Sequence, residues 1–215
     1  MTALTLYIGN KNHSSWSLRP WIGMRVAGIA FEEVVLPFDF EANNPAIKAI
    51  SPTGCVPVLK DGDLVIPESL AILDHVARRF PDKGLWPASM EDHTRALSMS
   101  LEMVSGFRDL REVCPMNIRR PKRKIAMTSQ AEADAARVIA IWSDALARSG
   151  GPFLFGGFSI ADAMFAPVVN RFDVYDIAVP AVAAAYMARM KALPAWQEWE
   201  AAARAETWTV PGYEV

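Results

Sequence analysis

Three serines stand close together in the segment His13-Ser14-Ser15-Trp16-Ser17-Leu18-Arg19-Pro20, between an alternating apolar run and an amphipathic stretch. The segment should form the turn from a strand into a helix. A helix N-terminus carries free amides and a partial positive charge, which stabilise an anion such as a thiolate. Because proline is tolerated near a helix start, Pro20 predicts a first turn at about Ser17. Ser14 and Ser15 would then face a ligand, although serines here are also common as helix caps.

Two later dipeptides could bind the rest of such a ligand. Val56-Pro57 opens an expected strand, and a cis bond there would turn the Val56 backbone outward. Glu68-Ser69 begins an expected helix, where the hydroxyl and free amides could bind a carboxylate and Glu68 could pair with an ammonium group. Taken alone, Val56-Pro57 favours an ordinary edge proline, and Glu68 favours a charge that complements the helix dipole.

The elements that position these residues alternate in type up to residue 80. Apolar residues switch between the two-residue and the 3.6-residue period, which is typical of a mixed α/β unit. The pattern predicts strands at 5–8, 31–36, 56–59 and 64–66, the last two forming a hairpin, and helices at 17–27 and 68–79. With a further short helix allowed in the central loop, the order matches a thioredoxin-like domain.

Beyond residue 88 almost everything is expected to be helical. Residues 81–87 break helix twice and predict a linker. Helices are expected at 90–113, 129–148, 159–174, 180–192 and 194–204. Ser159 and Asp162 should form a capping box at the start of one of them, a folding role rather than a catalytic one. The predicted fold is α/β plus all-α, with a domain at 1–80, a linker at 81–88 and a helical-bundle domain at 89–215.

Composition excludes several classes of protein. The chain has 215 residues, 52% hydrophobic and 21% charged, with a formal net charge of -2, so no general attraction to nucleic acid or an anionic membrane is expected. Cys55 and Cys114 lack CxxC spacing, which argues against a disulfide framework and a cysteine-based metal site. No signal peptide or membrane-spanning run is visible. We therefore expect a cytoplasmic protein without a metal.

As a set, four lines of sequence resemble the glutathione S-transferase family over nearly the whole chain: Ser14 to Ser17, residues 51–59, residues 67–72 and Gly156-Gly157-Phe158-Ser159-Ile160-Ala161-Asp162-Ala163. The resemblance implies that the thioredoxin-like domain binds glutathione and that the helical domain forms the co-substrate pocket. Serine-based bacterial members of the theta and zeta type are the most similar, since no tyrosine stands at the turn and Tyr7 lies too early, on the first strand.

The resemblance also implies site residues. Ser14 is the expected donor to the glutathione sulfur, and Ser15 and Ser17 are alternatives. Glutathione would be held by Ser14, Val56, Pro57, Glu68 and Ser69. The co-substrate pocket would include Trp16, Met103, Phe107, Arg111 and Asn117. A methionine and phenylalanine stripe is otherwise usually core, and a lone turn histidine such as His13 is usually a surface residue.

The implied activity is that of a glutathione transferase, which activates the glutathione thiol as a thiolate and conjugates it to a small electrophile. One alternative is a zeta-type glutathione-dependent isomerase of the maleylacetoacetate type, which Trp16 weakens because that pattern has cysteine there. A non-catalytic glutathione-binding module is the other. Family members are commonly dimers, so a homodimer is expected. The basic run at 119–124 favours a solvated loop over an anion site.

Overall fold

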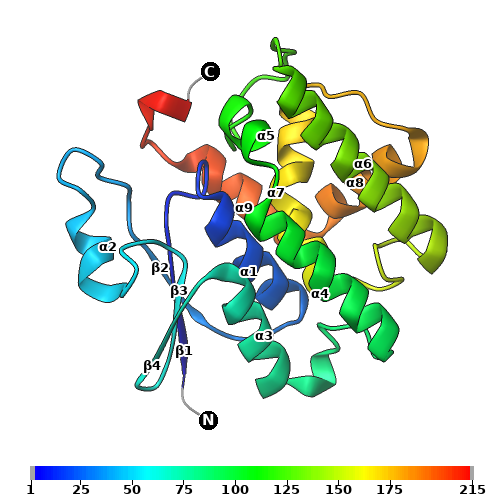
Figure 1. Ribbon diagram of the computed structural model, residues 1–215. Coiled ribbons are helices and arrows are strands. Elements are labelled where there is room, and N and C mark those ends of the chain that lie inside the picture. Colours follow the sequence, from blue (N-terminus) through cyan, green and yellow to red (C-terminus); the bar gives the residue numbers. More distant parts are fainter. Residues whose placement is uncertain (1–2, 214–215) are drawn as a thin grey trace.

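In the computed structural model, which describes residues 3–213, four short strands form one mixed sheet (Figure 1). The strands β1 (Leu4–Ile8), β2 (Glu32–Val35), β3 (Val58–Asp61) and β4 (Leu64–Pro67) lie in the order β2-β1-β3-β4. β1 runs parallel to β2 and antiparallel to β3, and β3 and β4 form the expected hairpin. The alternating residues of β1 are fully buried, as their two-residue period requires.

Three helices belong to this α/β part: α1 (Ser15–Val26), α2 (Pro45–Ile50) and α3 (Ser69–Arg79). Figure 1 shows α1 and α3 on the side of the sheet that faces the later helices, with α2 on the other side. α1 packs against α3, α7 and α9. This contact buries most of its surface and makes α1 the element shared by both halves of the chain.

The remainder is helical, which confirms the predicted fold class. The helices are α4 (Met90–Ser105), α5 (Arg108–Val113), α6 (Ser129–Ser149), α7 (Ile160–Val174), α8 (Ala181–Ala192) and α9 (Pro194–Ala205), with short 3-10 turns η1 (Pro81–Lys83) and η2 (Pro211–Tyr213). Nearly all of α7 is buried, so it forms the centre of the bundle. Within residues 3–213, every helix is too short or too polar to cross a bilayer.

The start of α7 carries the predicted Ser159–Asp162 pair. The buried Asp162 carboxylate accepts hydrogen bonds from the amides of Leu154 (3.1 Å) and Ser159 (2.8 Å) and from the Ser159 hydroxyl (2.9 Å). Burial nevertheless raises the pKa of the Asp162 carboxyl to about 6. The pair therefore ties the preceding loop to the first turn of the central helix.

Two helices differ from the sequence-based expectation by more than one residue. The helix expected at 90–113 is interrupted, because Gly106 is extended and Phe107 adopts a positive φ of 58° before α5 begins. α1 begins at Ser15 rather than Ser17, so Pro20 lies inside the helix. The predicted division into domains at residues 81–88 falls at η1 and the segment after it, and it stays a prediction.

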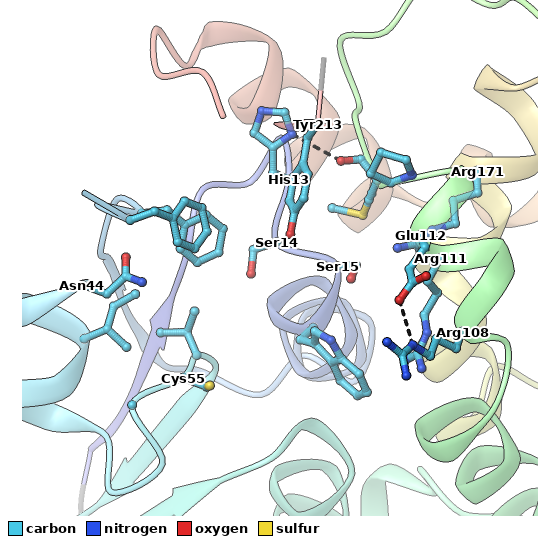
Figure 2. A pocket seen from close by; sticks show the side chains of 18 residues that line it. His13, Ser14, Ser15, Asn44, Cys55, Arg108, Arg111, Glu112, Arg171 and Tyr213 are labelled. Carbon is cyan, nitrogen blue, oxygen red and sulfur yellow. Dashed lines mark hydrogen bonds and ion pairs between the residues drawn. The ribbon is translucent and has the colours of Figure 1, made fainter. Parts of the chain in front are cut away.

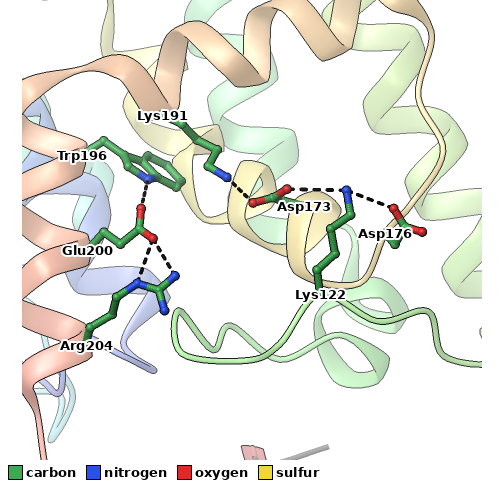
Figure 3. Close-up of polar contacts among 7 residues, drawn as sticks. All are labelled: Lys122, Asp173, Asp176, Lys191, Trp196, Glu200 and Arg204. Carbon is green, nitrogen blue, oxygen red and sulfur yellow. Dashed lines mark hydrogen bonds and ion pairs between the residues drawn. The ribbon is translucent and has the colours of Figure 1, made fainter.

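The basic run at 119–124 is a loop between helices with residues 121–124 exposed, as expected, but Arg120 departs from that expectation. Arg120 is buried, and its guanidinium donates to the carbonyl oxygens of Arg123 (2.8 Å) and Val174 (2.6 Å). Lys122 pairs with Asp176 at 3.1 Å and also approaches Asp173, which pairs with Lys191 of α8; Figure 3 shows this chain of charges. The run therefore anchors the segment before α6 to the end of α7.

Candidate active site

A tight turn at Asn10 carries the chain from β1 to the serines. The Asn10 carbonyl accepts hydrogen bonds from the amides of His13 (3.1 Å) and Ser14 (2.7 Å), and its side-chain oxygen accepts one from the Phe38 amide at 2.7 Å. A Cβ at Gly9 would lie 2.6 Å from the Phe38 ring and 3.1 Å from Ser14 Oγ. Glycine at this position therefore lets the ring and the hydroxyl pack directly against the backbone.

His13 fastens this turn to the helical part of the chain. Its ring is buried, Nδ1 lies 3.3 Å from the Met116 carbonyl oxygen, and Nε2 lies 3.0 Å from Asn12 Nδ2. A carbonyl only accepts, so the ring donates from Nδ1 to Met116. The Asn12 side-chain oxygen in turn accepts from the Arg119 amide at 2.9 Å.

The three serines occupy different positions at the start of α1. Ser17 is fully buried, and its Oγ accepts hydrogen bonds from the Gly9 amide (3.1 Å) and the Ser14 hydroxyl (2.7 Å). Ser15 is the first residue of α1, and within residues 3–213 its hydroxyl makes no hydrogen bond. Ser14 and Ser15 line a cavity. Ser17 does not line it, and its contribution is to accept the hydrogen bond of the Ser14 hydroxyl.

Pro20 has a structural consequence for Ser69. A regular helix would pair the Trp16 carbonyl with the amide of residue 20, but proline has no N–H. The Ser69 hydroxyl donates to this carbonyl instead, at 2.8 Å. The single hydroxyl proton of Ser69 is thereby used inside the protein, and the side chain is buried. α1 and the first turn of α3 are joined at this point.

A small cavity of about 180 Å³ lies between these helices and β3. The Val56–Pro57 peptide bond beside it is cis, and Glu68 precedes α3 with a φ of 71°. The small cavity is lined by Trp16, Thr53, Cys55, Val56, Pro57 and Glu68. The structure thus brings together the Val-Pro and Glu-Ser motifs that the sequence singled out.

A larger cavity of about 530 Å³ adjoins the small one, because Trp16, Cys55 and Val56 line both. Figure 2 shows Ser14 and Ser15 near its centre, Cys55 and Asn44 on one side, and Arg111 and Arg171 on the other. The other lining residues are His13, Phe38, Phe40, Ile47, Gly54, Arg108, Glu112, Pro115, Met116 and Tyr213.

Arginines give the site a positive field. Arg171 and Arg111 line the larger cavity, and Arg19 lies fully buried with its guanidinium 3.9 Å from the Trp16 ring centroid. Burial, together with the neighbouring guanidinium groups, lowers the pKa of Arg19 well below its usual range and that of Arg171 to about 10. The field of these cations favours an anion at the serines.

The structure does not bring every expected pocket residue to the cavity. Trp16 and Arg111 line it. Met103 and Phe107 lie instead in the apolar core: Met103 is on α4, which packs against α7, and Phe107 directly precedes α5. Asn117 is buried, and its amide nitrogen donates to the Tyr213 carbonyl at 3.3 Å. These three residues therefore support the pocket from outside its lining.

Several lining residues carried no signal in the sequence. Phe38 and Phe40 stack with ring centroids 5.3 Å apart after β2, in a loop without a recognisable motif. Tyr213 comes from the C-terminal segment, far from every motif. Arg171 lies in a mainly apolar predicted helix at 159–174, where a charged side chain draws attention, but Asp162 and Asp173 in the same helix give the same signal. Among residues 3–213, no group of three or more His, Cys, Asp or Glu side chains could hold a metal ion.

Comparisons with known proteins agree with this architecture. Residues 13–79 match the family model of the glutathione S-transferase N-terminal domain, and residues 118–202 match that of the C-terminal domain. Glutathione S-transferase 1 of Dianthus caryophyllus is 29% identical over 115 residues, which are 53% of this chain and about half (51%) of that protein. A probable maleylacetoacetate isomerase of Vibrio cholerae is 22% identical over 213 residues, covering 92% of this chain and 95% of its own. The theta-class glutathione S-transferase of Xanthomonas axonopodis pv. citri, solved with glutathione bound, has a TM-score of 0.67 and 26% identity, covering 92% and 97% of the two chains.

Proposed function

Because the chain belongs to the glutathione S-transferase family, we propose that it binds glutathione, stabilises its thiolate with a serine hydroxyl and conjugates it to a small electrophile. One observation carries the proposal. Ser14 and Ser15 lie at the N-terminus of α1, on the wall of a cavity that shares Trp16 and Val56 with the Val-Pro and Glu-Ser site. The Xanthomonas relative with bound glutathione supports the identity of the thiol.

Activation of the thiol is the main chemical task. A free thiol has a pKa near 8.5, and each unit by which the site lowers it corresponds to about 1.4 kcal/mol. A hydroxyl that donates to the sulfur and the positive end of α1 both favour the thiolate. Ser15 has a free hydroxyl for this purpose, whereas Ser14 would have to exchange its bond to Ser17 for one to the sulfur. Both serines remain candidates.

The rest of glutathione would occupy the smaller cavity. The Val56 backbone would pair with the peptide, and Pro57 in its cis form shapes that edge. Since the Ser69 hydroxyl donates to Trp16, the backbone amide of Ser69, rather than its hydroxyl, would donate to the ligand carboxylate. Glu68 would pair with the ammonium group.

Thiolate titration tests this proposal. The ultraviolet absorbance of the bound thiolate is followed against pH in the wild type, Ser14→Ala, Ser15→Ala and the double variant. Replacing the serine that contacts the sulfur by alanine should raise the thiol pKa by about one unit, since one hydrogen bond to a charged group contributes about 1.5 kcal/mol or more. Ser105→Ala, at the C-terminal end of α4 and outside the lining of both cavities, is the control. An unchanged pKa in the double variant would refute the serine mechanism.

A zeta-type isomerase is the second candidate, and the alignment with the Vibrio cholerae protein over nearly the full chain favours it. Trp16 stands where that class has cysteine, so the site lacks the thiol of that class at this position. The Trp16 ring instead packs on the guanidinium of Arg19. Turnover of a maleyl keto-diacid to its trans isomer would establish this activity. Absence of that turnover, together with conjugation of other electrophiles, would eliminate it. Tight glutathione binding without any turnover would instead identify a non-catalytic module.

We also propose a homodimer located in the cytoplasm. Leu64 on β4 and Met90 and Leu101 on α4 are large apolar side chains that stand at least half exposed. An interface between the N-terminal part of one copy and the helical part of another would cover them. Light scattering after size exclusion would give twice the 23.7 kDa chain mass for a dimer, and the chain mass itself would contradict the proposal.

A further inference from the structure

The segment after α9 returns across the serine loop and is fixed there. The Glu206 carboxylate accepts hydrogen bonds from the amides of Lys11 (2.6 Å) and Asn12 (2.9 Å). The Arg119 guanidinium donates to the carbonyl oxygens of Glu206 (2.5 Å) and Trp208 (2.6 Å). Charge-assisted bonds of this kind hold the backbone of the segment in one place.

Tyr213, at the end of this segment, is held by both its backbone and its ring. Its amide donates to the Val210 carbonyl at 2.8 Å, and its own carbonyl accepts from Asn117. The ring meets His13 edge to face at a centroid distance of 5.5 Å. Within residues 3–213, the hydroxyl makes no hydrogen bond. Figure 2 shows the phenol pointing into the cavity, toward Ser14.

The hydroxyl lies in the acceptor part of the site rather than in the glutathione part. Tyr213 lines the larger cavity with Met116 and Arg171, and none of these three lines the smaller cavity beside Val56 and Glu68. Arg171 is buried, and its guanidinium brings positive charge to the same part of the cavity. A hydroxyl without a partner in the described chain, beside a cation, matches a ligand that carries an electron-rich atom, since an apolar ligand would leave the hydroxyl unsatisfied.

We propose that Tyr213 contacts the electrophile and donates a hydrogen bond to the acceptor oxygen that gains negative charge, which selects electrophiles activated by a carbonyl group. The inference rests on the proposed function, and it adds the acceptor class and a residue from the C-terminal segment. A hydrogen-bond donor held in place before the reaction stabilises developing charge without reorganisation.

The reaction with an α,β-unsaturated ketone illustrates the role. The glutathione thiol loses its proton to water, and the thiolate sulfur forms a bond to the β-carbon. The π electron pair of the C=C bond forms a new double bond between the α-carbon and the carbonyl carbon, and the π bond of the carbonyl breaks, so that its electron pair moves onto the oxygen. The resulting enolate oxygen accepts from Tyr213. A proton from water then adds to the α-carbon and restores the carbonyl. Nothing is oxidised or reduced.

A substitution that removes only the hydroxyl tests the proposal. Tyr213→Phe keeps the ring beside His13, and Tyr7→Phe is the matched control on β1, outside both cavities. Two acceptors are compared: methyl vinyl ketone, whose oxygen gains charge, and a primary alkyl iodide, whose charge leaves as weakly hydrogen-bonding iodide. Tyr213→Phe should lower kcat/KM for the ketone about tenfold or more, and that for the iodide less than twofold. The pKa of bound glutathione should not change.

Equal losses with both acceptors, or no loss with the ketone, would overturn the role of Tyr213 and leave the proposed function intact. A wild type without turnover would refute the conjugating function, so binding provides a second test. Calorimetry compares S-(3-oxobutyl)glutathione with S-butylglutathione, which lacks the carbonyl. Tyr213→Phe should weaken the binding of S-(3-oxobutyl)glutathione by about threefold to tenfold and leave that of S-butylglutathione unchanged. Equal effects on both conjugates would contradict the inference even for a protein that only binds.

Discussion

Replacement of Asp162 by alanine should destabilise the protein in a pH-dependent way. The substitution leaves the amides of Leu154 and Ser159 without their buried acceptor. An unsatisfied buried donor costs about 1–3 kcal/mol, so the two together should cost about 2 kcal/mol or more at pH 7. The control is Asp144→Ala on α6, whose exposed pair with Arg148 should contribute less than about 1 kcal/mol.

The pH dependence follows from the carboxyl pKa of about 6 in the folded state, against roughly 3.9 in an unfolded chain. The raised value means that the folded protein binds the proton more tightly, so between about pH 6 and pH 4 it holds more protons than the unfolded chain. Stability from Asp162 therefore grows as the pH falls through this window and is lost as the pH rises through 6. As the pH falls from 7 to 5, the difference in the free energy of unfolding between the wild type and Asp162→Ala should increase by about 1.4 kcal/mol.

Urea unfolding of the wild type, Asp162→Ala and Asp144→Ala at pH 7, 6 and 5 measures this difference. The gap between wild type and Asp162→Ala should widen on acidification, while the gap for Asp144→Ala stays constant. If this gap narrowed on acidification, the hydrogen bonds would lower the pKa of the Asp162 carboxyl more than burial raises it, and the carboxylate would stay ionised. That result would refute the reasoning about Asp162.

Two further predictions concern the site. Glu206→Ala removes the carboxylate that accepts from the Lys11 and Asn12 amides, so hydrogen exchange followed by mass spectrometry should show these amides exchanging faster. The free energy of unfolding should fall by about 2 kcal/mol. Unchanged exchange would show that the loop is held without Glu206. Cys55 is exposed, whereas burial raises the pKa of the Cys114 thiol to about 11, so iodoacetamide should modify only Cys55 in the folded protein at pH 7.5. Because Cys55 lines both cavities, glutathione should slow its modification, and a rate independent of glutathione would place the ligand elsewhere.

Local patterns in the sequence predicted most of the elements. The alternation in β1 and the hairpin of β3 and β4 appear in the structure as expected. A strand with one buried face has apolar residues at every second position, and this pattern can be read from the sequence alone. The Ser159–Asp162 pair was equally accessible to prediction, because its partners lie three residues apart. The break at Gly106 was missed, because methionines and leucines continue the helical period across it.

The lining of the cavity was predicted only in part. Helical spacing placed Met103 and Phe107 on an apolar face, but it does not say whether another helix or a ligand covers that face. In the structure both side chains belong to the apolar core, and α7 packs against α4. Similarly, Ser69 was expected to offer its hydroxyl to a ligand, and no local pattern indicated that Pro20 leaves a carbonyl on α1 in need of a donor.

The sequence by itself determined the fold class, the family resemblance and the placement of a hydroxyl cluster at the start of a helix, because each rests on short motifs or periodic patterns whose residues lie within a few positions of one another, and on the order of these motifs along the chain. Tertiary structure alone decided that Ser17 is buried beneath Ser14, that Arg171 of α7 faces the serines, and that Tyr213 returns to the loop after β1. These relations join residues more than a hundred positions apart, except for the serine pair, whose difference depends on where α1 begins. The packing of helices onto the sheet sets such distances, and no periodicity in the chain encodes them.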